Sequence, residues 1–290
     1  MSKLNPILLG LSLAVAGSSM AAAQETAAFP KVLQITREFI KPGKAGMAHD
    51  KTESAFVAAM ARARFPTYYT AMNSLSGKTR ALYLTRYDSF EAWEKDNKAI
   101  DKNAALSAEL ERATVADGEL LDSMDQGVFV RDEDLSFRVH PDQSQTRFLE
   151  ITEFHVRLGH NAEWRKLVKM YRDAHEKTRT SAHWGMYEAA YGAEDGTWLL
   201  LSGDKSMADI DTGFKEDKQF RDALGEEGLK KLDELYGATV DHAYSELFQI
   251  NPRQSYVSPD WIQADPDFWK PKPAAASAAK PAKEESKAKP

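Results

Sequence analysis

The chain has 290 residues, of which 42% are hydrophobic and 28% charged, with no cysteine and a formal net charge of −6. This length is enough for about two domains with their own cores, and the composition is typical of a folded globular chain rather than a disordered or membrane protein. The absence of cysteine excludes disulfides, thiolate metal sites, iron–sulfur clusters and a cysteine nucleophile. The acidic balance argues against nucleic acid as a partner, because it repels the phosphate backbone.

Residues 1–23 have the pattern of a signal peptide. Lys3 gives a positive start, residues 7–17 form a short apolar run, and residues 21–23 are alanines suited to cleavage. A transmembrane helix needs about 20 apolar residues, which is more than this run contains. We therefore expect cleavage near Ala23 and a periplasmic or secreted protein with no transmembrane segment.

An internal repeat follows the signal peptide. Residues 32–43 (VLQITREFIKPG) align without a gap with residues 148–159 (FLEITEFHVRLG). Both segments alternate apolar and polar side chains and end in a glycine, which is typical of a strand followed by a turn. Each is followed by a stretch with helical periodicity, residues 46–64 in the first half and 162–180 in the second.

The rest of each half continues in one order: a two-stranded hairpin, a helix capped by serine, a charge-rich helical region and a final strand. In the first half, the hairpin strands are residues 67–73 and 79–87, the capped helix follows Ser89, the charge-rich region is 106–123 and the final strand is 127–131. In the second half, the hairpin strands are residues 183–190 and 197–203, the capped helix follows Ser206, the charge-rich region is 220–235 and the final strand is 246–251. The resulting order, β-α-β-β-α-β, is the ferredoxin-like unit, and it occurs twice.

The predicted fold is therefore α+β, with a first ferredoxin-like repeat at residues 24–139, a linker at 140–146 and a second repeat at 147–256. The helices of such a unit cover only one face of its antiparallel sheet and leave the other face in need of a partner. Two copies in one chain can be partners for each other, so we expect their sheets to face across a shared interior as an intrachain α/β barrel. Two independent domains that each dimerise with another molecule remain the alternative.

Two further segments close the chain. Residues 257–269, with Tyr256 just before them, are rich in proline and include three large aromatics, Trp261, Phe268 and Trp269. Tryptophan is costly to expose, so we expect this segment to lie along the folded body as an extended strap, with binding of a partner as the alternative. Residues 270–290 are rich in Ala, Lys and Pro and are predicted to be disordered. This basic tail is a candidate for peripheral contact with an anionic surface.

A family resemblance rests on two motifs. Lys41-Pro42-Gly43 at the end of the first strand, and residues 87–93 (YDSFEAW), resemble the dimeric α/β-barrel superfamily. That superfamily includes monooxygenases of the antibiotic-biosynthesis type, NIPSNAP-like proteins and haem-degrading monooxygenases. The resemblance implies the tandem barrel fold, but it does not specify a reaction, since one fold hosts many activities.

The haem-degrading members of this superfamily use an asparagine on the first strand and a histidine ten residues beyond the tryptophan of the second motif. The corresponding positions here are Thr36 and Asn103. Without that iron ligand, the resemblance implies no haem chemistry, and we expect no cofactor. Four other histidines could substitute as ligands, but no pattern supports them: His155, His175, His183 and His242.

Other motifs of catalysis or metal binding are incomplete. His175 and Glu176 begin an H-E-x-x-H motif, but Arg179 stands where the second histidine belongs. Gly77-Lys78-Thr79 lacks the earlier glycine of a phosphate-binding loop, because that position is Met72. We therefore predict no metal site, and we interpret the second segment as a hairpin turn.

Strand alternation suggests which side chains form a site. Leu33 and Ile35 match two apolar residues of the second repeat, so we expect this side of the strand to face the helices. The other side would then face the barrel interior and supply ligand-binding residues there: Gln34, Thr36, Thr152 and Phe154, with Tyr83 from the hairpin. Glu38 and Glu150 lie on the same side. As buried carboxylates with raised pKa values, they are the candidate general bases.

Three functions stay open from the sequence. The first is a protein that binds a small, partly apolar ligand in the barrel interior. The second is a cofactor-independent monooxygenase-type enzyme, in which Glu38 or Glu150 removes a substrate proton. The third is a structural or interaction protein with a filled barrel. A cavity lined by an unpaired carboxylate would favour the first two, whereas mutually bonded polar groups without a cavity would favour the third.

Overall fold

The computed structural model describes residues 30–139 and 143–270, so the expected signal peptide, part of the linker and the tail from residue 271 lie outside the described residues. The first repeat consists of β1 (Val32–Ile40), α1 (Met47–Ala63), β2 (Tyr69–Ser74), β3 (Arg80–Tyr87), α2 (Phe90–Lys102), α3 (Ala104–Gly118) and β4 (Leu121–Phe137). The second consists of β5 (Phe148–Val156), α4 (Asn161–Thr178), β6 (Trp184–Tyr191), β7 (Thr197–Asp204), α5 (Met207–Thr239) and β8 (Val240–Ile250). Two short helices follow, α6 (Pro259–Ala264) and α7 (Pro266–Trp269).

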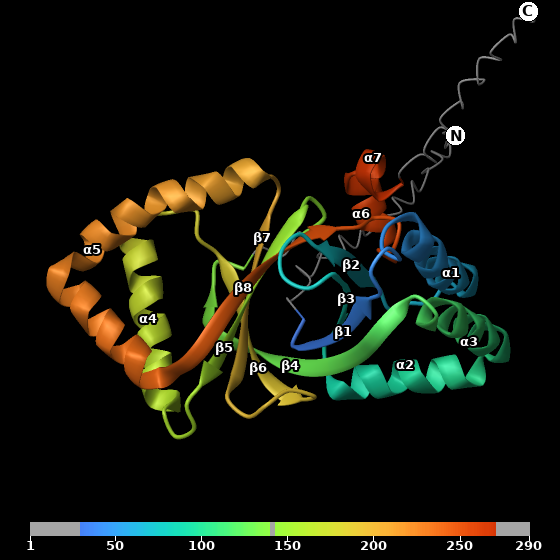
Figure 1. Cartoon of the computed structure of the whole chain (residues 1–290), viewed down its shortest axis with the longest axis horizontal. Coiled ribbons are helices and arrows are strands. Elements are labelled where there is room, and N and C mark those ends of the chain that lie inside the picture. Colours follow the sequence, from blue (N-terminus) through green and yellow to red (C-terminus); the bar gives the residue numbers. More distant parts are fainter. Residues whose placement is uncertain (1–29, 140–142, 271–290) are drawn as a thin grey trace, which may run out of the picture.

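The strands of the described residues form one closed barrel in the order β1-β3-β2-β8-β5-β7-β6-β4 (Figure 1). Each repeat contributes four neighbouring antiparallel strands, and the repeats meet at two seams, β2 with β8 and β4 with β6. The predicted α+β fold of two facing ferredoxin-like repeats within one chain is therefore confirmed.

One strand is much longer than predicted. The sequence indicated a strand at residues 127–131, whereas β4 extends from Leu121 to Phe137. Its first part pairs with β1 and its last part with β6, with an irregularity in register between Asp132 and Phe137. The strand is long because it crosses from one sheet to the other. It also replaces the end of the helical region expected at residues 106–123.

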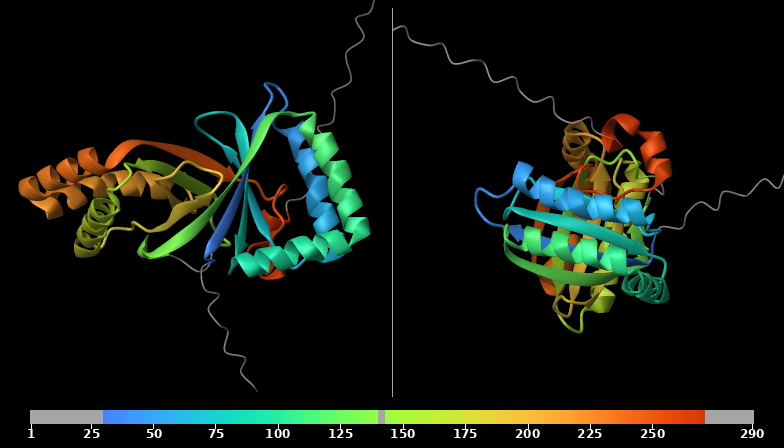
Figure 2. Two further views of the ribbon diagram at one scale, coloured as in Figure 1. Left: turned by 90° about the horizontal axis from the view of Figure 1, so that it is seen from below. Right: turned by 90° about the vertical axis from the view of Figure 1, so that its right-hand side faces the viewer.

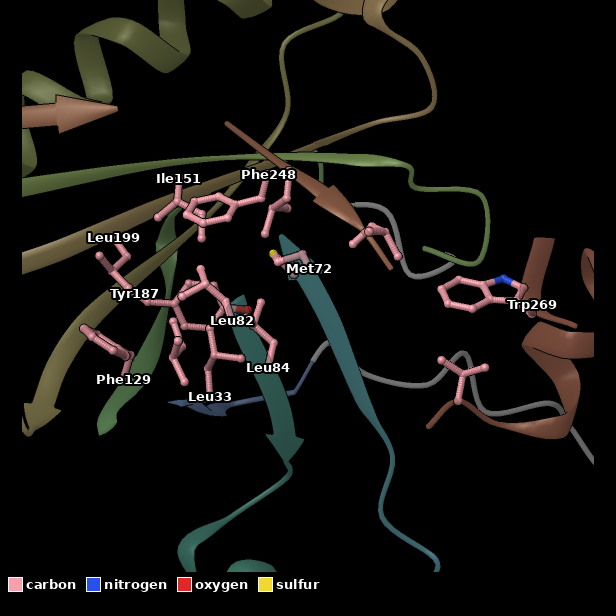
Figure 3. Close-up of a cluster of buried hydrophobic side chains, with 14 residues drawn as sticks. Leu33, Met72, Leu82, Leu84, Phe129, Ile151, Tyr187, Leu199, Phe248 and Trp269 are labelled. Carbon is pink, nitrogen blue, oxygen red and sulfur yellow. The ribbon is translucent and has the colours of Figure 1, made fainter. Parts of the chain in front are cut away.

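Apolar side chains from both sheets fill the barrel interior. Leu33, Leu84 and Phe129 of the first repeat pack with Ile151 and Phe248 of the second (Figure 3). Their side of each strand therefore faces the barrel and not the helices, so the predicted facing was wrong. The physical reason is closure: the interior of a closed barrel is shut off from water, so the most uniformly apolar side of each strand is buried there.

This reversal moves the predicted site residues. They lie on the outer, helix-facing side of the sheets and not in the barrel interior: Gln34, Thr36, Glu38, Tyr83, Glu150, Thr152 and Phe154. Side chains of the apolar cluster lie in the barrel interior, where these residues were expected to bind a ligand.

The helices cover the outer faces of the two sheets. In the first repeat α1 and α3 lie side by side, and α2 runs across one end of this pair (Figure 2). In the second repeat α4 and α5 pack together. The long helix α5 is kinked at Gly225, whose φ of 66° and ψ of 177° are outside the helical region. None of the helices in residues 30–139 and 143–270 is long and apolar enough to cross a membrane.

The segment after β8 packs on the body. The backbones of Tyr256 and Tyr69 exchange two hydrogen bonds, of 2.8 and 3.1 Å. Trp269 is buried, and its Nε1 donates to the carbonyl of Ser144 at 2.8 Å. The strap also contains α6 and α7, so it is not extended throughout.

Candidate functional site

The two repeats differ in the space between sheet and helices. The sheet and helices of the second repeat line most of a cavity of about 1520 Å³, which also reaches Leu33 and Arg86 of the first repeat. Aromatic and apolar side chains make up much of its wall, including Phe154, Trp164, Leu167, Tyr171, Phe214 and Phe220. Titratable groups are fewer and include Glu150, His175, His183 and Asp204. A concave, mostly apolar space with a few polar groups is the usual form of a small-molecule site.

The helices hold this cavity open by packing on each other. Tyr171 and His175, one turn apart on α4, both stack on Phe220 of α5, with ring centroids 5.3 and 4.6 Å away. On the sheet side, Phe154 contacts the ring of Trp164 at 5.1 Å. Phe214 is largely exposed, so the cavity is open to solvent beside it.

Three of the predicted residues lie on the wall formed by β5. Thr152 and Ser245 share a hydrogen bond of 2.7 Å between their hydroxyls, and Phe154 packs on α4. Burial raises the pKa of Glu150, and the nearby Asp204 raises it further. Burial likewise raises the pKa of Asp204. This end of the cavity therefore has two acidic groups that keep their protons more strongly than in water.

His175 is the histidine of the described residues best placed to act as a ligand in this cavity. Its Nδ1 lies 2.8 Å from Oγ1 of Thr180, and burial lowers its pKa, which favours the neutral ring. In His183, by contrast, both ring nitrogens lie near backbone carbonyls. His155 and His242 stack on each other at 4.0 Å and are not part of the cavity wall.

In the first repeat, a buried polar cluster occupies the space between sheet and helices. Glu38 comes from β1, His49 and Glu53 from α1, and Asp117 from α3, and none is more than 7% exposed. Nε2 of His49 lies 3.1 Å from Oε2 of Glu38 and 3.5 Å from Oδ1 of Asp117. One ligand atom from each of the four residues lies within 4.8 Å of the others, so the set could hold a metal ion. We call these four residues the carboxylate cluster.

Three carboxyl groups crowd together around one imidazole in the carboxylate cluster. The pKa of Glu53 is raised to about 9, chiefly by burial and also by repulsion from Glu38 and Asp117. Burial and the charge of Glu53 also raise the pKa of Tyr83 well above its ordinary value. Among the described residues, His49 is the one basic side chain that forms an ion pair with these carboxylates.

The predicted residues are thus divided between two places. Glu150, Thr152 and Phe154 share one cavity wall. Glu38 and Tyr83 belong to the surroundings of the carboxylate cluster, and Thr36 accepts a 3.3 Å hydrogen bond from Gln126. Gln34 is half-buried on the same side of β1.

Sequence reasoning missed three of the four residues in the carboxylate cluster: His49, Glu53 and Asp117. A signal existed, because His49 and Glu53 are four residues apart and so lie on one face of α1. Asp117 offered no such pattern. Its place depends on how α3 packs beside α1.

Comparisons with known proteins give similarity in structure alone. No protein-family model matches the chain, and no curated protein matches its sequence. Among solved structures, a candidate monooxygenase from Fusobacterium nucleatum covers 77% of this chain and 93% of its own, with 12% identity and a TM-score of 0.49. An anthrone oxidase-like protein covers 76% and 92%, with 14% identity and a TM-score of 0.48. A heme-binding protein from Thermus thermophilus covers 81% and 94%, with 10% identity and a TM-score of 0.44.

The expectation against haem is corrected at this point. That expectation was based on one position, Asn103, where a histidine ligand is missing. The structure places another histidine, His175, on the wall of a large cavity. One of the structurally similar proteins is itself described as heme-binding. Because Asn103 belongs to the first repeat, the lack of a histidine there does not exclude haem from the cavity beside His175. From its own strand order, the chain has the tandem α/β-barrel fold of the superfamily that its sequence resembles.

Proposed function

We propose that the second repeat binds a small, largely apolar molecule in the cavity between its sheet and helices α4 and α5. The observation that supports this is the cavity itself, about 1520 Å³ in volume and lined mainly by aromatic and aliphatic side chains. Burying apolar ligand surface against such a wall is favourable by about 25 cal/mol per Å². Most of this site lies on the helix side of the sheet, and it also reaches Leu33, Leu149 and Tyr187 of the apolar barrel cluster.

The polar groups of the cavity would orient the ligand. Glu150 and Asp204 stand at one end, and their raised pKa values allow a protonated carboxyl to donate a hydrogen bond at mildly acidic pH. His175 is neutral and held at Nδ1 by Thr180. The ligand class that fits is therefore an apolar body with one polar or ionisable end.

Haem is a member of this class that can be tested directly. Thr180 holds one ring nitrogen of His175, which leaves Nε2 as the nitrogen that can coordinate iron, and a partner on the other nitrogen is the usual arrangement for a metal-bound histidine. Bound haem would supply redox or oxygen chemistry. His175 would hold the iron, while the aromatic wall would pack against the apolar faces of the group.

Titration of the full chain tests the site. We expect haemin and the fluorescent probe anilinonaphthalene sulfonate to bind saturably and to compete. Gly213 lines the cavity, and a Cβ at this position meets no atom within 4 Å, so Gly213→Trp should obstruct part of the cavity without a clash at Cβ. Gly237→Trp on the same helix is the matched control, because Gly237 is also uncrowded but is not part of the wall.

The expected result is a loss of probe binding in Gly213→Trp and normal binding in Gly237→Trp. If the two variants bind equally, the ligand site is elsewhere and the proposal fails. His175→Ala should remove the haemin absorption shift, while His242→Ala should keep it. If both histidine variants keep the shift, His175 is not the iron ligand, although the cavity can still be the site of binding.

A second candidate function uses the same cavity for catalysis without a cofactor. Glu150 faces the ligand space with a raised pKa, which suits a general base that takes an acidic proton from the ligand before its carbanion reacts with oxygen. Glu150→Gln should then abolish oxygen uptake in the presence of the ligand and leave probe binding intact. Unchanged oxygen uptake would exclude Glu150 as the base.

We also propose that the protein is exported from the cytoplasm. The pattern of residues 1–23 supports a cleaved signal peptide and a periplasmic or secreted location. N-terminal sequencing of the protein recovered from cell fractions tests it. A mature chain that begins at Gln24 is the expected result, and a retained Met1 would contradict it.

A further inference from the structure

We propose that Glu38, His49, Glu53 and Asp117 bind one divalent transition-metal ion of the Mn²⁺ or Fe²⁺ type. The site lies between β1, α1 and α3 of the first repeat. It is separate from the ligand cavity, whose wall includes none of these four residues. The inference is therefore independent of the proposed function.

The first argument is the balance of charge. Three carboxyl groups and one imidazole meet where each residue is at most 7% exposed. Among the described residues no lysine or arginine pairs with them. Buried acidic groups normally have a cation or a full set of hydrogen-bond donors, because an isolated charge in a protein interior is very costly. A metal ion would supply the missing positive charge.

The second argument is an unsatisfied atom. Glu53 is 3% exposed, and its Oε1 has no hydrogen bond of ordinary length. This carboxyl belongs to the group of ligand atoms that converge within 4.8 Å of one another. A buried carboxyl oxygen with no hydrogen bond of ordinary length, on a residue that belongs to a converging set of potential ligands, favours a metal position there.

The spacing also fits a coordination sphere. Metal–ligand bonds of about 2.1 Å place ligand atoms of one sphere about 3 to 4.2 Å apart. Nε2 of His49 is 3.1 Å from Glu38 and 3.5 Å from Asp117, and the whole set spans at most 4.8 Å. A contraction of a few tenths of an ångström would therefore bring all four atoms to bonding distance.

Neighbouring side chains hold the ligands in place. Oγ1 of Thr52 donates to Oδ1 of Asp117 at 2.6 Å. Nε2 of Gln254 lies 3.2 Å from Nδ1 of His49 and donates to Asp50 at 2.9 Å. Partners of this kind orient metal ligands and contribute to affinity. Gln254 follows β8, the last strand of the second repeat. The chain therefore has to fold back from the second repeat onto the first before the site is complete.

The donor set indicates the type of metal. Three carboxylates favour Mg²⁺, Mn²⁺ or Fe²⁺, and the imidazole favours a transition metal over Mg²⁺ or Ca²⁺. The second repeat lacks the set, because Phe154, Arg165 and Lys169 stand at the positions that match Glu38, His49 and Glu53. One site per chain is therefore the expected stoichiometry.

The experiment uses the full chain, stripped with a chelator and titrated with MnCl₂. We expect one equivalent of Mn²⁺ to disappear from the free-ion electron paramagnetic resonance signal and to raise Tm. Pulsed resonance should detect one nitrogen coupling, from His49. Gln254→Ala should weaken the affinity by about 10–100-fold. Glu53→Gln and His49→Ala should lose stoichiometric binding, whereas Glu150→Gln in the other repeat should keep it.

Three results would overturn the proposal: no stoichiometric binding by the wild type, bound Mn²⁺ without a nitrogen coupling, or equal affinity in folded Glu53→Gln. Circular dichroism establishes that each variant is folded. If neither ligand variant folds, the nitrogen coupling in the wild type decides the question. Failure of this experiment leaves the cavity proposal untouched, because the cavity is tested with other variants and other probes.

Discussion

The two repeats share one topology but differ in the space between sheet and helices. In the first repeat, buried acidic groups and a histidine from β1, α1 and α3 meet between the sheet and the helices. In the second, Phe154 takes the place of Glu38, α4 and α5 pack on each other, and a cavity of about 1520 Å³ remains. The barrel interior is a core shared by both repeats. The outer faces can therefore differ in their side chains without loss of the fold.

A second contrast concerns the two sides of one sheet. The barrel side is packed with apolar side chains from both repeats, whereas the outer side of β5 carries Glu150, Thr152 and Phe154. Stability should therefore depend mainly on the inner side and ligand binding on the outer side. This comparison can be tested one residue at a time.

The largest effect is expected in the shared interior. Phe248 is fully buried between the two sheets, so Phe248→Ala should lower the free energy of unfolding by about 3–5 kcal/mol. Phe154→Ala should cost about half as much, because Phe154 already borders a cavity. Urea unfolding of both variants measures the difference. Equal losses would contradict the division between a packed inner side and an open outer side.

The next effect concerns the kink of α5. Gly225 has a φ of 66° and a ψ of 177°, a conformation available almost only to glycine. Gly225→Ala should therefore cost about 1–3 kcal/mol, although a Cβ there would meet no atom within 4 Å. Thermal unfolding measures the loss, and probe binding shows whether the cavity changes with the kink. No loss would mean that α5 can straighten.

The pH dependence of stability tests a single carboxyl group, Glu150, on the outer side of β5. Burial raises the pKa of Glu150 above its unfolded value, so the folded state binds the proton more tightly. The contribution of Glu150 to stability should therefore be fully present below its unfolded pKa. This contribution should be lost as the pH rises through its folded pKa. Glu150→Gln removes this loss, so its Tm should exceed that of the wild type near pH 7 and match it near pH 4. A lower Tm for Glu150→Gln than for the wild type near pH 7 would show that the folded protein stabilises Glu150 as a carboxylate.

The smallest effect is expected on the solvent side of α5. Lys218 and Asp222 form an exposed pair one turn apart. Such pairs contribute about 0.2–0.5 kcal/mol, so Asp222→Asn should change stability by no more than that. Probe binding should stay at the wild-type level. A large change in either quantity would show that the outer surface of α5 takes part in holding the cavity.

Local patterns in the sequence were enough to predict the repeat, the order of its elements and the closed barrel. Residues 32–43 and 148–159 match without a gap, and each β-α-β-β-α-β unit leaves one sheet face to be covered. These inferences succeed because side-chain periodicity and turn residues act over a few positions. The long strand β4 could not be predicted in this way, because its length depends on pairing with both β1 and β6.

Tertiary structure decided which side of each strand is inward and which side chains meet. The apolar side that includes Leu33 could have faced helices or the barrel, and only closure, which excludes water from the interior, decides between them. Glu38, His49 and Asp117 come from three elements, and Gln254 reaches them from beyond β8. The cavity depends on how α4 and α5 pack. Contacts between residues so far apart in the chain have no periodic signal, so the sequence by itself determined the repeats and their topology, and folding created the sites.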